Sequence, residues 1–524
     1  KTQWEKRGYI LPAFDIETMV EETHKNPKWV HFGAGNIFRV FPAAMQQHLL
    51  NEGIEKCGII VGEGFDYEII DEVFAKHDNL TLMVTLKSDG SIDKEVIASV
   101  ASAHKCDPQF AQEWEFFKNV FANPSLQMAS MTITEKGYSL SGGDGSFYPA
   151  VQADLEAGPD KSSVFIAKLT ALVYERYKKG AGPLALVSMD NCSHNGEKLA
   201  QAVQTIANEW QKRDFVDAGF LSYLEKSVSY PWSMIDKITP RPDETVKKML
   251  EADGFEDTSL IITDKHTYTA PFVNAEQPQY LVIEDDFANG RPALEKAGVY
   301  FTNRDTVNNV ERMKVTTCLN PLHTALAIYG CLLGHTLISE EMRDPELKRL
   351  VERIGYDEGM PVVVDPKILD PKTFIDEVLN VRFPNPFMPD APQRIATDTS
   401  QKLGIRFGET IKAYLADPAL DIADLKMIPL VYAGWLRYLM GLDDELNAFT
   451  PSPDPRLAEA QAYLASIKIG DTGPFPSLEP LLSDESIWGV DLIAIGMAPL
   501  VLEYFSSLIA GKGAVRATLK EHVH

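Results

Sequence analysis

Three polar side chains of catalytic type lie in a segment that is otherwise typical of a buried helix. Residues 311–326 have the sequence ERMKVTTCLNPLHTAL, with Lys314, Asn320 and His323 among apolar neighbours. An apolar pocket lowers the pKa of a lysine, which can then accept a proton near neutral pH, while asparagine amides stabilise an oxyanion and a histidine orients a substrate. A structural role is the simpler interpretation of any one of them. The three together make an active site a competing hypothesis.

A glycine-rich turn follows the first strand-like run and could hold a dinucleotide. The tripeptide GAG (33–35) comes after WVHF and opens a helical pattern. Such glycines let backbone N–H groups approach a pyrophosphate, but Phe38 takes the place of the third glycine, so a turn without a ligand is an equal alternative. The next strand ends at Glu63, with Asp66 close behind. An acid there accepts hydrogen bonds from a ribose and favours NAD over NADP.

Two further segments carry polar residues that could contact a substrate. The turn 188–196, SMDNCSHNG, offers amide donors after a buried strand, although a capped turn is the simpler interpretation. The segment 382–406 concentrates basic residues in an otherwise acidic chain, namely Arg382, Arg394, Lys402 and Arg406. These could hold a carboxylate or a polyol, or they could be ordinary surface charge.

Composition narrows the function classes. The 524 residues carry a formal charge of −25, which argues against nucleic acid or an anionic membrane as a partner. Five scattered cysteines without a CxxC pair indicate neither a disulfide framework nor a zinc knuckle. We find no signal peptide and no apolar stretch long enough for a membrane span. These features predict a cytoplasmic protein.

The order of elements predicts an α/β N-terminal Rossmann-like domain and a predominantly α-helical C-terminal domain. Up to about residue 300, strand-like runs alternate with helical patterns, as in βαβ units; the runs are 29–35, 57–64, 80–87, 128–138 and 182–191. Beyond that point helical spacing dominates. We place the junction in 284–298 and predict domains at 1–295 and 296–524.

Seven motifs in order resemble the polyol-specific long-chain dehydrogenases, the family of mannitol dehydrogenase and mannonate (fructuronate) oxidoreductase. They are VHFGAGNIFR, TITEKGY (132–138), SMDNCSHNG, IDKITP (235–240), GRPALEKAGV, MKVTTCLNPLH and RFPNPFMPDAPQRIATDTSQK (382–402). The resemblance covers roughly residues 28–410. It implies a Rossmann-like NAD-binding domain, a helical second domain and a metal-free active site between them.

The resemblance also implies roles for particular residues. Lys314 would be the general acid–base, and Asn320 with Asn195 or Asn191 would polarise the reacting oxygen. His323, Asp236, Arg394 and Lys402 would contact the sugar. The residues implied for the cofactor are Gly33, Gly35, Asn36, Phe38, Arg39, Glu63 and Asp66.

One departure from the family pattern predicts an irregular backbone. Between Lys314 and Asn320 stand five residues, VTTCL, one more than is usual in the family. At about 100° per residue, a straight helix would then turn Lys314 away from His323. We therefore predict a one-residue π-bulge or a helix break there, with Asn320 as N-cap and Pro321 as the first residue of a new helix.

The expected activity is NAD-dependent interconversion of a keto-sugar acid and an aldonate, D-fructuronate and D-mannonate first. Interconversion of mannitol and fructose, or reduction of tagaturonate, is the alternative, and a non-catalytic NAD-binding protein is a remote one. We expect a monomer or a small homo-oligomer. The sequence leaves open the stereochemistry of the substrate and the choice between Asn191 and Asn195.

Overall fold

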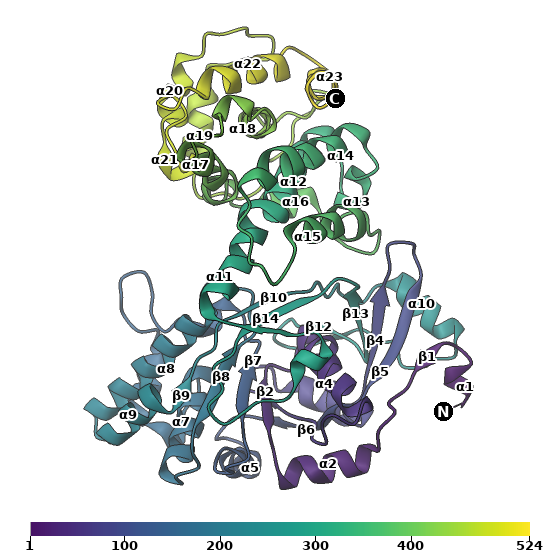
Figure 1. Cartoon of the computed structure of the whole chain (residues 1–524), viewed down its shortest axis with the longest axis vertical. Coiled ribbons are helices and arrows are strands. Elements are labelled where there is room, and N and C mark those ends of the chain that lie inside the picture. Colours follow the sequence, from purple (N-terminus) through teal and green to yellow (C-terminus); the bar gives the residue numbers. More distant parts are fainter. Residues whose placement is uncertain (1) are drawn as a thin grey trace. The chain divides into compact units, whose positions relative to one another are not determined.

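The computed structural model describes residues 2–524 and divides into two compact units (Figure 1). The first unit runs up to Lys87 and from Ser91 to Asn308, and the second comprises Ser88–Gly90 and Asn309–His524. Each unit has its own core and is described by itself.

A six-stranded, all-parallel sheet forms the centre of the first unit. Its strand order is β6-β3-β2-β7-β8-β9. The strands are β2 (Trp29–Phe32), β3 (Ile59–Glu63), β6 (Val100–Lys105), β7 (Met128–Met131), β8 (Leu184–Ser188) and β9 (Val228–Ser229). Four of the predicted runs are thereby confirmed as β2, β3, β7 and β8.

Both faces of this sheet are covered, which explains why its strands are apolar at nearly every position. Val30 and Phe32 face one core, whereas Trp29 faces the other. The first core is closed by α5 (Ala111–Phe121), α7 (Phe165–Lys178), α8 (Asn195–Lys212) and α9 (Ala218–Lys226). The second is closed by α4 (Pro42–Asn51) and by a small sheet of β10 (Ser233–Asp236), β14 (Tyr280–Glu284) and β15 (Tyr300–Thr302).

The predicted strand at 80–87 is confirmed as β4 (Thr81–Leu86), but it lies in a separate mixed sheet. That sheet has the order β1-β5-β4-β13, with β1 (Tyr9–Ile10), β5 (Ile92–Ile97) and β13 (Phe272–Glu276). Strand β5 runs antiparallel to β4. The unit also contains a hairpin of β11 (Ile261–Ile262) and β12 (Tyr268–Thr269) and the helices α1 (Thr2–Glu5), α2 (Ile16–Lys25), α3 (Asn36–Val40), α6 (Pro149–Ala157) and α10 (Glu244–Ala252).

The second unit is helical, as predicted. Helix α11 (Arg304–Met313) spans the sequence boundary of the units. The α-helices that follow are α12 (Asn320–Leu333), α13 (Ile338–Glu341), α14 (Pro345–Glu352), α15 (Pro371–Glu377), α16 (Pro392–Ile395), α17 (Glu409–Ala416), α18 (Met427–Leu439), α19 (Leu457–Leu464), α20 (Glu479–Leu482), α21 (Glu485–Trp488), α22 (Ala498–Leu508) and α23 (Ala514–His522). Four π-helical turns interrupt them: η6 (Lys314–Cys318), η7 (Arg353–Gly359), η9 (Val378–Arg382) and η11 (Gly404–Gly408). The fold class predicted from the sequence is confirmed.

A buried carboxyl group in the second unit makes the stability depend on pH. Glu341 is fully buried, and neither of its oxygens has a hydrogen-bond partner within residues 2–524. It packs against Gly330 of α12, where an added Cβ would come within 2.2 Å of its Oε1. Burial, with Asp344 and Glu340 adding to it, holds the pKa of Glu341 well above its usual range. The folded protein therefore favours the neutral form of this group.

We expect the free energy of unfolding to fall as the pH rises above the ordinary glutamate range. Above that range the folded state still binds a proton that the unfolded state has released. The contribution of Glu341 to stability is therefore full at low pH and is lost as the pH rises towards its folded-state pKa. The Glu341→Gln variant should lose this decline. The free energy of unfolding can be measured by denaturant titration at about pH 5 and about pH 8. Between these two pH values, the difference between variant and wild type should shift in favour of the variant by more than about 1.4 kcal/mol, the equivalent of one pKa unit. An exposed glutamate serves as control, since Glu479→Gln should follow the wild type. Parallel curves for Glu341→Gln and the wild type would contradict the prediction.

Candidate active site

A pocket of about 630 Å³ opens at the carboxyl ends of β2, β3 and β7 in the first unit. Open α/β sheets bind their ligands at this edge. The predicted residues Gly33 and Glu63 line it. Its other walls are formed by Gly64, Phe65, Ile133, Thr134, Lys136, Gly137, Ser139, Leu140, Tyr148, Ala150, Val151 and Ser163–Ile166. We predicted none of these others individually, although TITEKGY was among the most distinctive motifs.

The GAG turn has the geometry that a close backbone approach requires. Gly33 has φ +97°, and a Cβ placed on it would come within 2.1 Å of the Thr132 carbonyl oxygen. Gly35 precedes α3 with φ −78°, and a Cβ there would meet nothing within 4 Å. Gly33 is thus needed for the turn itself, whereas Gly35 leaves open space in front of it.

A chain of polar groups beneath the turn fixes its position. Ser130 Oγ accepts a hydrogen bond from Trp29 Nε1 (2.7 Å) and lies 2.7 Å from His31 Nδ1. His31 Nε2 lies 3.0 Å from Thr132 Oγ1, which in turn donates to the Gly33 carbonyl oxygen at 3.3 Å. Complete burial lowers the pKa of His31 to about 3, so its ring is neutral. The network links β2 to β7 immediately below the pocket.

Three residues implied for the cofactor point elsewhere. The Phe38 ring is fully buried and stacks on His31 at 4.2 Å. Arg39 is buried too and donates to Thr81 Oγ1, Thr269 Oγ1 and the Ala270 carbonyl. Asn36 contacts β12, through the Tyr268 carbonyl and the Thr269 hydroxyl, each at 3.2 Å. We correct the expectation that the Phe38 and Arg39 side chains line the phosphates, because both are packed in the core.

The two acids proposed for the ribose differ in their surroundings. Glu63 ends β3 and accepts hydrogen bonds from the backbone N–H groups of Ala34 (2.9 Å), Phe65 (2.9 Å) and Asp66 (3.2 Å). Burial raises the pKa of Glu63, and these three donors oppose that rise. The Asp66 carboxylate instead accepts from the hydroxyls of Thr263 and Thr267, both at 2.6 Å. Of the two acids, Glu63 lines the pocket and is the better candidate.

The turn after β8 distinguishes the two candidate asparagines. Asn195 is fully buried; its amide nitrogen donates to the Ser188 and Asp190 carbonyls and to Ser233 Oγ, and its oxygen accepts from the Ser233 N–H. Both N–H donors of this side chain are therefore engaged, and its oxygen accepts one hydrogen bond. Asn191 is exposed at the same sheet edge. Of the two asparagines, Asn191 is the better candidate for the predicted polarising role, because the amide hydrogens of Asn195 are already engaged. Asp236 is buried at the end of β10.

The segment that carries Lys314 has the predicted irregularity. A π-helical turn, η6, spans Lys314–Cys318, and the Leu319 N–H donates to the Lys314 carbonyl at 3.1 Å. This wide turn absorbs the extra residue, and α12 starts directly after it. Lys314 is only 7% exposed, so it does not point to solvent. The predicted π-bulge is confirmed. Such bulges are frequently found at functional sites of proteins.

The cap of α12 differs from the prediction. Leu319, and not Asn320, is the N-cap residue, and no side chain caps the helix. The Asn320 amide is therefore not used for capping, and its buried Oδ1 has no hydrogen-bond partner within residues 2–524. Buried polar atoms are rarely left without a partner in native proteins, so this one is a candidate ligand contact.

Charged side chains of the segment 390–406 surround His323. The imidazole stacks on Phe383 at 5.2 Å, and its Nε2 lies 3.6 Å from Asp390 Oδ2. Burial lowers the pKa of His323, and Asp390 opposes this while Arg406 and Arg394 add to it. Arg394 pairs with Asp390, and Lys402 Nζ donates to the Ile395 and Thr397 carbonyls. Since η6, α12, α16 and η11 pack against one another, the second unit brings these predicted residues into one region.

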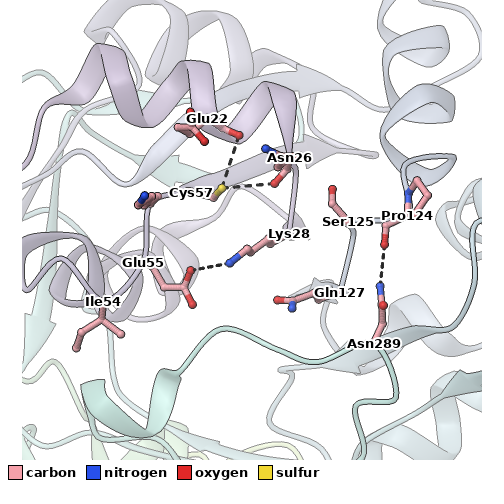
Figure 2. A pocket seen from close by; sticks show the side chains of 11 residues that line it. Glu22, Asn26, Lys28, Ile54, Glu55, Cys57, Pro124, Ser125, Gln127 and Asn289 are labelled. Atoms are coloured by element: carbon pink, nitrogen blue, oxygen red, sulfur yellow. Dashed lines mark hydrogen bonds and ion pairs between the residues drawn. The ribbon is translucent and has the colours of Figure 1, made fainter.

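A second pocket, of about 590 Å³, lies at the opposite edge of the six-stranded sheet (Figure 2). Most of its polar groups bind each other. Lys28 Nζ pairs with Glu55 at 3.1 Å, and the Cys57 thiol donates to the Glu22 and Asn26 carbonyls. This pocket lies away from the edge where an α/β sheet places its ligands.

Residues 2–524 contain neither a metal-binding cluster of side chains nor a membrane-spanning helix. No three histidine, cysteine or acidic side chains there are grouped in a way that could hold a metal ion. Every helix in that range lacks the length and apolar character needed to cross a bilayer.

The whole chain resembles known sugar and polyol dehydrogenases. D-mannonate oxidoreductase of Thermotoga maritima is 53% identical over 526 residues, covering 100% of this chain and 97% of the relative. D-mannonate oxidoreductase of Escherichia coli is 29% identical, covering 84% of this chain and 86% of the relative. The ternary complex of Pseudomonas fluorescens mannitol 2-dehydrogenase with NAD and D-mannitol has a TM-score of 0.68 at 26% identity, covering 98% and 96% of the two chains.

Family models match both halves of the sequence. Residues 27–296 match the mannitol dehydrogenase Rossmann domain, and residues 306–495 match the mannitol dehydrogenase C-terminal domain. The resemblance predicted from the seven motifs is confirmed: the chain belongs to the mannitol dehydrogenase family.

Proposed function

We propose that this protein is an NAD-dependent oxidoreductase that interconverts D-fructuronate and D-mannonate. One observation carries the choice of substrate, namely 53% identity over the whole chain to a relative named D-mannonate oxidoreductase. The family consists of dehydrogenases acting on CH–OH groups, which confirms the predicted enzyme class and removes the non-catalytic alternative. The domains predicted at 1–295 and 296–524 would supply cofactor binding and substrate chemistry, respectively.

NAD is the cofactor that the family and the pocket support. A solved family member is a complex with NAD. In this chain the pocket at the carboxyl ends of β2, β3 and β7 has the size of a cofactor site, and Glu63 on its wall would repel a 2′-phosphate. Gly33 and Gly35 would hold the pyrophosphate, and Glu63 the adenosine ribose. Bound NAD supplies hydride acceptance and donation.

The protein side of the reaction is proton transfer and charge stabilisation. Lys314 would take the proton of the substrate hydroxyl in oxidation and return it to the oxygen in reduction. The amides of Asn320 and Asn191 would donate to that oxygen while it carries negative charge. His323, Asp236, Arg394 and Lys402 would orient the sugar. The cytoplasm is the proposed compartment, since the five cysteines are all free thiols.

The test is NADH oxidation with D-fructuronate, D-tagaturonate and D-fructose as substrates. We expect kcat/KM to be highest for D-fructuronate and higher with NADH than with NADPH. Mannitol chemistry is the second candidate, because a solved relative holds D-mannitol. Turnover of fructose without reduction of either uronate would favour mannitol chemistry and would refute the proposed substrate. A higher kcat/KM for tagaturonate than for fructuronate would also refute the proposed substrate.

A further inference from the structure

Arg406, a half-buried arginine of the second unit, has neither an anionic nor a carbonyl hydrogen-bond partner within residues 2–524. Its single hydrogen bond within residues 2–524 runs from Nη1 to Thr324 Oγ1, at 2.6 Å. Arg516, by comparison, donates to the carboxylates of Asp344 and Glu346, and Arg437 donates to three backbone carbonyls. A guanidinium has five N–H donors, so most of those on Arg406 remain available.

This charge is only partly hydrated. Burial lowers the pKa of Arg406 to about 10, and no neighbouring carboxylate opposes the shift. Holding a cation away from water without a counter-ion is costly, which makes such a group unusual unless an anion completes the site. The planar fork of an arginine matches the two oxygens of a carboxylate.

Arg406 lies among the groups of the candidate active site. Thr324 directly follows His323 on α12, and Arg406 is close enough to His323 to help keep its pKa low. The turn that carries Arg406, η11, packs against η6, the turn that begins with Lys314.

The other cations nearby are already engaged. Lys402 donates to two backbone carbonyls, those of Ile395 and Thr397. Arg394 pairs with Asp390, and its side chain is 68% exposed. Arg406 combines burial, charge and free donors.

We infer that Arg406 binds the carboxylate of the substrate and so sets the preference of this enzyme for sugar acids over neutral sugars. The inference rests on the proposed function. Arg394 and Lys402 then position the chain of hydroxyls, and Thr324 fixes the plane of the guanidinium.

The test compares kcat/KM of the Arg406→Gln variant with NADH for D-fructuronate and for D-fructose. A lost charged hydrogen-bond pair should lower the value for fructuronate by about 30-fold or more, while the value for fructose changes less than about threefold. Arg406→Lys should recover part of the loss, because it restores the charge. Thr324→Val removes only the neutral partner of Arg406. It should lower the ratio of kcat/KM for fructuronate to kcat/KM for fructose, by a smaller factor than Arg406→Gln does.

Each failure has its own signature. If the wild type reduces no uronate, the proposed function is wrong. If the wild type reduces fructuronate but Arg406→Gln lowers kcat/KM for both substrates equally, or for neither, the inference is wrong. Product inhibition by D-mannonate gives a second measurement, and its inhibition constant should rise together with the fructuronate KM. Arg349→Gln, an exposed arginine on α14, serves as control and should match the wild type.

Discussion

The Lys314→Met variant should lose about 10²- to 10⁴-fold in kcat in both directions, the usual contribution of a general acid–base. This corresponds to about 3–5 kcal/mol of transition-state stabilisation. The methionine keeps the length and the apolar stem in a position that is only 7% exposed, so the fold should be retained. Steady-state rates of NADH oxidation and of NAD reduction measure the loss.

Two further variants separate proton transfer from electrostatics. Lys314→Arg keeps the positive charge, but an arginine stays protonated and cannot accept a proton, so oxidation should be lost here too. A small primary amine added to Lys314→Ala, whose truncated side chain leaves room for it, should restore part of the rate. Lys348→Met, an exposed lysine of the same unit, should behave as the wild type. A wild-type rate in Lys314→Met would remove this residue from the mechanism.

The irregular turn at Lys314 shows how far sequence alone can go. A single extra residue between Lys314 and Asn320 predicted the π-turn, because helical periodicity leaves few ways to keep both side chains on one face. The same reasoning misplaced the cap, since the widened turn makes Leu319 the last residue before the helix and frees Asn320.

Other parts of the site depend on segments distant in sequence. The motif does not distinguish Asn191 from Asn195; Ser233, 38 residues beyond Asn195, bonds both the amide nitrogen and the amide oxygen of Asn195. Arg39 is held in the core by Thr81, Thr269 and Ala270, distant partners that the pattern GAGNIFR does not reveal. The wall of the pocket at the carboxyl ends of β2, β3 and β7 draws residues from 133–140, 148–151 and 163–166, which only the folded sheet brings together.

Alanine substitutions at the two glycines of the GAG turn, Gly33 and Gly35, should have large and different effects on stability and on NADH binding. In Gly33→Ala the new Cβ would come within 2.1 Å of the Thr132 carbonyl oxygen, at a residue with φ +97°. Backbone strain and overpacking should each cost about 1–3 kcal/mol, so the unfolding midpoint should fall markedly. NADH binding, followed by protein fluorescence, should weaken with it because the turn must move.

Gly35→Ala isolates the ligand contact from the fold. Its φ of −78° suits alanine, and the new Cβ would meet no protein atom within 4 Å. Stability should therefore change by less than about 1 kcal/mol, the usual cost of an alanine at a helix N-cap. If the pyrophosphate approaches this turn, however, the methyl group occupies its space, and the Kd for NADH should rise at least tenfold while kcat at saturating NADH changes little. A stable Gly35→Ala protein that binds NADH like the wild type would place the pyrophosphate elsewhere, and Gly33 would then be required only for the turn between β2 and α3.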